Sequence, residues 1–324
     1  MHMPVPGSRE DRAAGVLLGT ACGDALGVPY EFSVRLSESQ VPRMLGGGLG
    51  DYAPGEYSDD TQMAVCIAEA VREHGDPLSP QALRQTADNF LRWAEEGATD
   101  IGAQTRRVLR GSGHAQGRPE VAEVMTAFSA REFASGVRCA GNGSLMRTAP
   151  LALAHLDDPE LLARSALAYS ALTHGDPLAG EACVLWCEGI RRAVVHGDTE
   201  GVRAGLELLP ADRRGQWGTW LDEAEAGPPH SFPNNGFVVT ALQAAWSAVT
   251  RNPEGFTPAL HAAVRAGNDT DTVAAITGAL LGARWGVSAI PAEYLDAVHG
   301  WPGHRTGSLV ELALSLVSGE KTGR

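Results

Sequence analysis

The sequence has little positive charge. Its 324 residues include 26 lysines and arginines against 39 aspartates and glutamates, which gives a formal net charge of −13 at pH 7. No run of basic residues concentrates positive charge locally. A surface this acidic repels the phosphates of nucleic acids and of anionic lipid headgroups. We therefore expect no nucleic-acid partner.

Long apolar stretches are also absent, and cysteines are few. No segment reaches the length of about 20 apolar residues that a membrane-spanning helix needs. Residues 13–22 resemble part of a lipoprotein leader, but Glu10 and Asp11 stand where such a leader is basic. The five cysteines are odd in number and lie in apolar or glycine-rich contexts, which favours a reducing compartment. We expect a monomeric cytoplasmic protein without a membrane segment.

Apolar residues recur with helical spacing along almost the whole chain. After Ser58, the residues Met63, Ile67 and Val71 share one helix face, and the pattern ends at Gly75. Sustained alternation of apolar and polar residues, which indicates strands, is missing. The pattern predicts an all-α fold of ten or more helices, and no Pro-rich or charged linker divides it into two domains. Further helices are predicted over residues 80–96, 160–173, 177–196, 236–251 and 306–317.

Two segments carry glycines four residues apart. The spacing occurs in residues 15–29 and again in residues 278–291, at Gly15, Gly19, Gly23, Gly278, Gly282 and Gly286. On a helix, such glycines leave a smooth stripe that another backbone can approach closely. Two central helices packed on each other are predicted.

Two short clusters combine carboxylates with a hydroxyl at predicted helix starts. Either cluster alone could serve only as an N-cap, because the first turn of a helix favours acidic and hydroxyl groups. Together they supply the hard oxygen ligands that Mg²⁺ or Mn²⁺ requires, and four carboxylates balance the charge of two divalent ions. The candidate metal ligands are Ser58, Asp59, Asp60, Asp269, Asp271 and Thr272.

A glycine-rich turn, residues 141–144, precedes Leu145, Met146 and Arg147. A turn that opens onto a helix exposes backbone N–H groups suited to phosphate, although Gly-Asn-Gly is also ordinary turn chemistry. His174 is predicted to end a helix, where it could reach the same anion or be solvated.

Seven motifs in sequence order resemble the ADP-ribosylglycohydrolase family, particularly bacterial members that act on ADP-ribosylarginine. The motifs are GDALGVPYEF, YSDDT, DIG, GNGSLMR, THGDP, NNGFVV and GNDTDT. They lie between about Gly15 and about Pro291, which is nearly the whole chain. Their order makes the resemblance far more specific than any one motif.

The resemblance implies a single-domain orthogonal multi-helix bundle over residues 1–324, with a core from about residue 11 to 318. It implies two Mg²⁺ or Mn²⁺ ions in a central cleft, held by the six ligands above. It also implies catalytic roles for Glu31, on a mobile loop near the scissile bond, and for Asp100. The substrate-binding residues that it implies are Gly141, Asn142, Gly143, Ser144, His174, Gly236 and Phe237.

Some positions leave alternatives open. Glu31 could be an exposed loop carboxylate, Asp100 the N-cap of a helix, and Phe237 plain core. Two positions depart from the family pattern: Ser58 stands where threonine is commoner, and Asn268 where glycine is usual. Neither exchange removes an essential oxygen.

The expected activity is metal-dependent hydrolysis that removes ADP-ribose from an arginine side chain of a modified protein and releases ADP-ribose. Asp100 in its Asp-Ile-Gly context favours arginine. One alternative is O-linked ADP-ribose, on serine or as acetyl-ADP-ribose. Another is a family member that binds ADP-ribose without catalysis, because fold membership does not prove activity.

Overall fold

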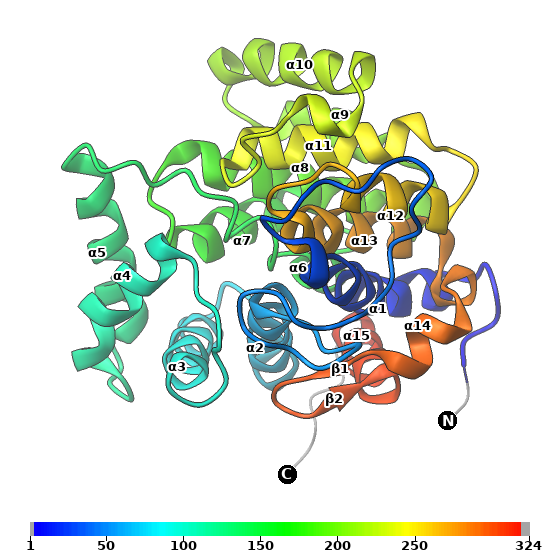
Figure 1. Cartoon of the computed structure of the whole chain (residues 1–324). Coiled ribbons are helices and arrows are strands. Elements are labelled where there is room, and N and C mark those ends of the chain that lie inside the picture. The colour runs from blue at the N-terminus through cyan, green and yellow to red at the C-terminus, as the bar shows by residue number, and fades with distance from the viewer. Residues whose placement is uncertain (1–2, 319–324) are drawn as a thin grey trace.

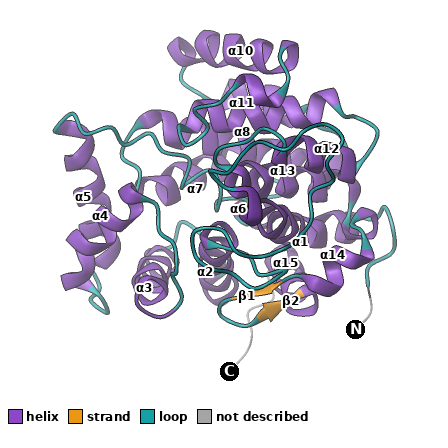
Figure 2. Cartoon of the chain, in the orientation of Figure 1, coloured by secondary structure: helices purple, strands orange, loops and turns teal. Residues whose placement is uncertain are grey.

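Helices make up nearly all the regular structure. The computed structural model describes residues 3–318, and within them fifteen α-helices surround a common core (Figures 1 and 2). A pair of two-residue antiparallel strands is the exception in this range. The all-α prediction is confirmed. The assignment of residues 1–324 to a single domain stays a prediction, and its two ends lie outside the described residues.

Twelve of the described helices are nine residues or longer. They are α1 (Arg9–Gly27), α2 (Asp59–His74), α3 (Pro80–Glu96), α4 (Ala103–Ser112), α5 (Val121–Ala134), α7 (Pro159–Ala171), α8 (Pro177–His196), α10 (Ala211–Ala226), α11 (Val238–Arg251), α12 (Phe256–Val264), α13 (Thr270–Trp285) and α15 (Thr306–Ser318). The predicted helices agree with these bounds to within two residues at either end.

Short elements connect the long helices. They are α6 (Leu151–Ala154), α9 (Gly201–Ala204), α14 (Ala292–Ala297), the 3₁₀ turns η1 (Val28–Tyr30), η2 (Gly113–Ala115), η3 (Gly205–Leu208), η4 (Pro229–Ser231) and η5 (Val287–Ala289), and the strands β1 (His299–Gly300) and β2 (His304–Arg305). No helix in residues 3–318 combines the length and apolar character needed to cross a membrane.

Helices α1 and α13 pack against each other along their glycine stripes, as the sequence predicts. A Cβ added to Gly19 would lie 2.0 Å from the carbonyl oxygen of Gly278, and one added to Gly282 would lie 1.9 Å from that of Gly15. The contact continues to Gly27, where a Cβ would lie 2.4 Å from the Cα of Asp271. The antiparallel pair therefore brings the C-terminal end of α1 to the acidic N-terminal end of α13.

This close approach predicts a large difference between two glycine-to-alanine substitutions. Gly19→Ala should destabilise the fold by about 3 kcal/mol or more, because the added methyl group meets backbone that cannot move aside without separating the helices. Gly218→Ala, in α10, is the matched control, because a Cβ there meets nothing within 4 Å. It should stabilise the protein by up to about 1 kcal/mol. Denaturant unfolding measures both; similar midpoints for the two variants would contradict the packing.

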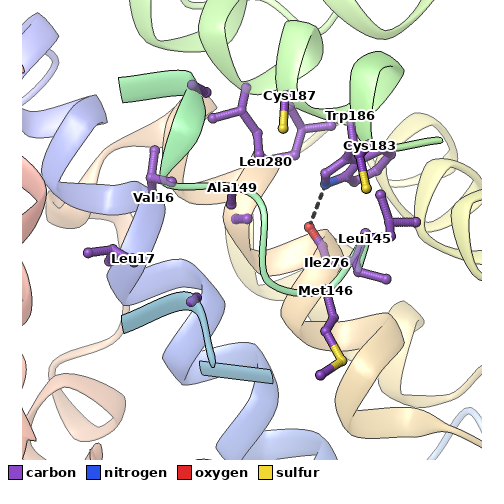
Figure 3. Packing of buried hydrophobic residues seen from close by; sticks show 14 of the residues in the cluster. Val16, Leu17, Leu145, Met146, Ala149, Cys183, Trp186, Cys187, Ile276 and Leu280 are labelled. Carbon is purple, nitrogen blue, oxygen red and sulfur yellow. Dashed lines mark hydrogen bonds between the residues drawn. The ribbon is translucent and has the colours of Figure 1, made fainter. Parts of the chain in front are cut away.

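The core joins α8 to the central pair. Trp186 of α8 donates its indole N–H to the carbonyl oxygen of Ile276 in α13 at 2.9 Å (Figure 3). Met146, Cys183 and Cys187 belong to the same buried cluster. All five cysteines are buried and free, as expected for core residues.

Candidate active site

A cleft of about 400 Å³ opens at the acidic end of α1, α2 and α13. Carboxylates form one wall, and the glycine-rich turn and His174 lie in its lining as well. Eleven of the predicted site residues line it: Glu31, Asp59, Asp100, Gly141, Asn142, Gly143, His174, Gly236, Asp269, Asp271 and Thr272.

The two acidic clusters do more than cap their helices. Ser58 and Asp269 occupy the N-cap positions of α2 and α13, but neither side chain makes a capping hydrogen bond to its own helix. The hydroxyl of Ser58 instead lies 2.8 Å from Oδ1 of Asp24 and 3.0 Å from Oδ2 of Asp60. Ser58 and Asp269 are therefore not simple N-caps, whereas Asp271 accepts the backbone N–H of Thr272 in the first turn of its own helix at 2.9 Å.

Asp24, near the end of α1, caps α2 across the helix interface. Its Oδ1 accepts the backbone N–H of Ser58 at 2.8 Å, and its Oδ2 accepts the N–H and the hydroxyl of Thr61 at 3.0 and 2.6 Å. Burial raises the pKa of Asp24 to about 6 in spite of these bonds. Asp24 is not among the site residues that the sequence predicts. An aspartate within an otherwise apolar, glycine-striped helix is the signal that could have found it.

Asp60 presents a buried oxygen that needs a partner. Its Oδ1 has no hydrogen-bond partner among the described residues, and the side chain is fully buried. Leaving such an acceptor without a partner costs about 1–3 kcal/mol. Burial and the nearby charge of Asp24 raise the pKa of Asp60 well above its usual range. A bound cation would give this oxygen a partner and would stabilise the charged form of the carboxylate.

Three carboxylates of the cluster converge on one another. Glu31, Asp269 and Asp271 each place an oxygen within 4.8 Å of the others. Burial, followed by the charges of Asp269 and Asp100, raises the pKa of Glu31 to about 8. Burial and the charge of Asp60 raise the pKa of Asp271 well above its usual range. The half-buried Glu31 is thus part of the cluster rather than a free loop carboxylate.

The donor chemistry of the cluster fits hard divalent cations. No lysine or arginine lines the cleft in the part of the chain that the structure describes. Burial, followed by the charge of Asp100, also raises the pKa of Asp59. Carboxylate and hydroxyl oxygens are the ligands that Mg²⁺ and Mn²⁺ prefer. The residues present therefore fit the metal that the sequence predicts.

The segment after the glycine-rich turn is not the predicted helix. Residues 142–147 form consecutive turns, and α6 begins only at Leu151. Pro150 lacks an N–H and disfavours helical geometry at the residue before it, which prevents a helix from continuing through this segment. The hydroxyl of Ser144 accepts a hydrogen bond from Ser170 at 2.9 Å within the core, and Ser144 is absent from the cleft lining. The prediction of a helix N-terminus at this turn is wrong. Substrate binding by Ser144 stays a prediction, and its hydroxyl is engaged in the core.

Asn142 ties the turn to the metal-ligand candidates. Its Nδ2 donates to Oδ2 of Asp269 at 2.8 Å and to the carbonyl of Asn235 at 2.9 Å. Asn235 accepts the backbone N–H of Asp269 at 3.1 Å, so two asparagines hold this aspartate. Asn235 was not among the predicted residues, although it is the second asparagine of the NNGFVV motif.

Phe237 lies beside the cleft rather than in its lining. It pairs with Gly141 in an isolated antiparallel bridge and lines a neighbouring hollow together with Gly236. Gly236 lines both hollows and accepts the backbone N–H of Asn142 at 3.2 Å. The phenyl ring is half-buried, so it is neither plain core nor part of the acidic site.

The segment before α4, the first turn of α4 and the segment before α8 supply the remaining wall. Asp100 lies before α4, whose N-cap is Gly102, so the N-cap alternative for Asp100 is wrong. His174 follows the end of α7 and is only 3% exposed, so it is not a solvated helix-end residue. Gln104 was not predicted; its Nε2 donates to the carbonyls of Cys139 and Thr173 at 2.8 and 3.0 Å and joins these two segments.

The exchange of glycine for Asn268 is compatible with the backbone. Asn268 has φ of 60°, a left-handed conformation that asparagine adopts more readily than most residues. Its carbonyl accepts the N–H of Phe32 at 2.7 Å. The position therefore joins the loop that carries Glu31 to the start of α13.

Comparisons with known proteins show which family the chain resembles. The sequence model of the ADP-ribosylglycohydrolase family matches residues 6–323. The ADP-ribosylarginine hydrolase Tri1 of Pseudomonas putida (strain GB-1) is 31% identical over 303 residues, covering 91% of this chain and 76% of that protein. The ADP-ribosyl-[dinitrogen reductase] glycohydrolase of Rhodospirillum rubrum is 28% identical over 295 residues, covering 89% and 90%.

More distant relatives and solved structures agree as well. Human ADP-ribosylhydrolase ARH3 is 24% identical over 341 residues and covers 90% of each chain. A solved structure described as an ADP-ribosylglycohydrolase-related protein complex superposes with a TM-score of 0.75 at 33% identity, covering 96% of this chain and 98% of that one. The chain belongs to the ADP-ribosylglycohydrolase family, whose members hydrolyse ADP-ribose linkages.

Proposed function

We propose that this protein is a metal-dependent hydrolase that removes ADP-ribose from arginine side chains of modified proteins. The observations that carry the proposal are the carboxylates of Glu31, Asp269 and Asp271, which converge within 4.8 Å in the cleft lining, and the buried Oδ1 of Asp60, which has no partner among the described residues. The relatives whose names specify arginine or dinitrogen reductase support the linkage. The five free, buried cysteines support a cytoplasmic location, and the acidic charge argues against a nucleic-acid partner.

We assign the cluster to two Mg²⁺ or Mn²⁺ ions. Bound there, the ions would supply Lewis-acid chemistry and a binding site for the ribose hydroxyls. Asp24 has a different role, because its four hydrogen bonds to Ser58 and Thr61 hold the start of α2 in place. The ions would be held by Ser58, Asp59, Asp60, Asp269, Asp271 and Thr272.

Glu31 and Asp100 would move the protons of the reaction. Hydrolysis adds a hydroxyl to C1″ of ADP-ribose and a proton to the leaving guanidine nitrogen, so the site needs both a base and an acid. In the metal-free structure, burial and then the charges of Asp269 and Asp100 raise the pKa of Glu31 to about 8, so this carboxyl group can hold a proton near neutral pH. The acidic wall also stabilises the positive charge that develops at C1″ in an oxocarbenium-like transition state.

The opposite wall would hold the diphosphate of the substrate. Gly141 and Gly143 bring bare backbone to the cleft, and the side chain of His174 lines the cleft next to them. Asn142 is already engaged with Asp269, so its role is to position that carboxylate.

An assay with two linkages tests the proposal. Arginine-ADP-ribosylated and serine-ADP-ribosylated proteins are incubated with the enzyme and Mg²⁺, Mn²⁺ or a chelator, and free ADP-ribose is measured. We expect metal-dependent release that is at least about tenfold faster from arginine, a preference of about 1.4 kcal/mol. Release only from serine would show that the substrate is O-linked ADP-ribose instead of ADP-ribosylarginine. Binding of ADP-ribose without release from either protein would indicate a non-catalytic binding protein.

A further inference from the structure

Arg147 is a buried cation that forms no ion pair with a carboxylate within the described residues 3–318. Its side chain is fully buried, and its guanidinium carbon lies 4.4 Å from the centre of the Phe90 ring. Its Nη2 donates to the hydroxyl oxygen of Thr173 at 2.7 Å, while its Nε has no partner among the described residues. A charge this costly to bury calls for a role beyond packing.

The contact between Arg147 and Thr173 decides where the threonine proton lies. A guanidinium group can only donate, so Oγ1 of Thr173 accepts from it. The same Oγ1 lies 2.7 Å from Nδ1 of His174. Within residues 3–318, Nδ1 is the one remaining hydrogen-bond partner of this hydroxyl, so the arrangement that uses its single proton directs it at Nδ1. In that arrangement Nδ1 carries no proton, and the neutral ring carries its proton on Nε2.

The second ring nitrogen faces the cleft. A Cβ added to Gly143 would lie 3.3 Å from Nε2 of His174, and one added to Gly141 would lie 3.5 Å from it. Nε2 has no hydrogen-bond partner in the described part of the chain, and His174 lines the cleft. Burial, and then the charge of Arg147, lower the pKa of His174 well below its usual range, which keeps the ring neutral.

We propose that Arg147 and Thr173 are positioning residues that hold His174 in the tautomer with Nε2–H, so that the ring presents a fixed hydrogen-bond donor to an anionic oxygen. The reverse tautomer would present a lone pair to the same oxygen and repel it. A neutral donor also leaves the carboxylates free for cations, whereas a cationic side chain in the cleft would compete for them. The identity of the anion as the ADP-ribose diphosphate rests on the proposed function.

Nuclear magnetic resonance of the full chain with ¹⁵N-labelled histidine tests the tautomer directly. A long-range ¹H–¹⁵N correlation spectrum should show His174 with a protonated Nε2 and an unprotonated Nδ1. Thr173→Val keeps the side-chain shape without the hydroxyl and should replace this pattern by a mixture of tautomers. Thr173→Ser should restore it. His155, whose Nε2 lies 2.9 Å from the hydroxyl of Ser165, is the internal control and should not change.

Binding of ADP-ribose, measured by calorimetry, gives the second readout. Thr173→Val should weaken binding about tenfold and Thr173→Ser should not. Arg147→Lys keeps a donor and should preserve the tautomer, whereas Arg147→Met should lose it; if Arg147→Met does not fold, the two Thr173 variants decide.

A protonated Nδ1 in the wild type, or an unchanged His174 signal in Thr173→Val, would overturn the proposal. The expected tautomer without any ADP-ribose binding would instead contradict the proposed function and leave the tautomer assignment standing.

Discussion

Asp60→Asn is expected to lower the rate of ADP-ribose release by about 10³-fold or more, a loss of about 4 kcal/mol of transition-state stabilisation. The reason is the buried Oδ1 of Asp60, which has no protein donor among the described residues and is therefore free to bind a cation. The amide nearly matches the carboxylate in shape but carries no charge to balance the ion. Steady-state release of ADP-ribose from arginine-modified protein at saturating Mg²⁺ or Mn²⁺ measures the effect.

A second readout separates this effect from misfolding. In the metal-free protein, burial and then the charges of Asp24 and Asp59 raise the pKa of Asp60 well above its usual range. Removing that charge should leave the metal-free melting temperature unchanged or higher, while the increase on adding metal is lost. Asp296→Asn, at an exposed position of α14, is the matched control and should behave like the wild type. An Asp60→Asn enzyme that retains activity and metal stabilisation would refute the assignment of Asp60 as a ligand.

The metal-free protein is expected to become less stable as the pH rises from about 5 to about 8. The pKa of Glu31 is raised to about 8 and that of Asp24 to about 6 in the folded state, both by burial. In the unfolded chain such groups release their protons near pH 4. Between these values the folded state binds more protons than the unfolded state, so stability falls with rising pH. Thermal unfolding in the presence of a chelator measures the trend.

Divalent metal should reverse this trend. At a metal concentration of about 100 Kd, binding to one site adds about 2.7 kcal/mol, which corresponds to roughly 4 °C in Tm for a chain of this length. The increase should be larger at pH 8 than at pH 6, because protons compete with the metal for the same carboxylates. The chelator should also abolish ADP-ribose release. A metal-free Tm that rises with pH, or an equal metal effect at both pH values, would contradict the carboxylate site.

The sequence predicts those features of the fold and the site that depend on local residue patterns. The bounds of α3 and α8 follow from apolar periodicity, and the pairing of α1 with α13 follows from glycine spacing. The acidic clusters are visible because each combines several ligand types within a few residues. The local pattern also gave a wrong prediction at residues 145–147. A helix is predicted to begin there, but these residues, which precede Pro150, form turns.

The residues that the sequence analysis missed act across long separations. Asp24 binds residues 34 and 37 positions away, Gln104 binds residues 35 and 69 positions away, and Asn235 binds Asp269, 34 positions away. Nothing near Asp24, Gln104 or Asn235 in the sequence indicates these partners, because their roles arise only when separate helices and loops meet. The direction of the Ser144 side chain was unpredictable for the same reason.

The pairing of α1 with α13 also has a consequence for the order in which the molecule is made. The hydroxyl of Thr270, at the start of α13, donates a hydrogen bond to the carbonyl oxygen of Gly27, at the end of α1, 243 positions away in the sequence. The candidate ligands Asp269 and Asp271 are the sequence neighbours of Thr270. During synthesis, the glycine stripe of α1 cannot pack against α13 until nearly the whole chain has been made. Contacts of such long range form late and slow the folding of a domain. The metal site should therefore be among the last parts of the protein to form, and a nascent chain that ends before α13 has no site to load.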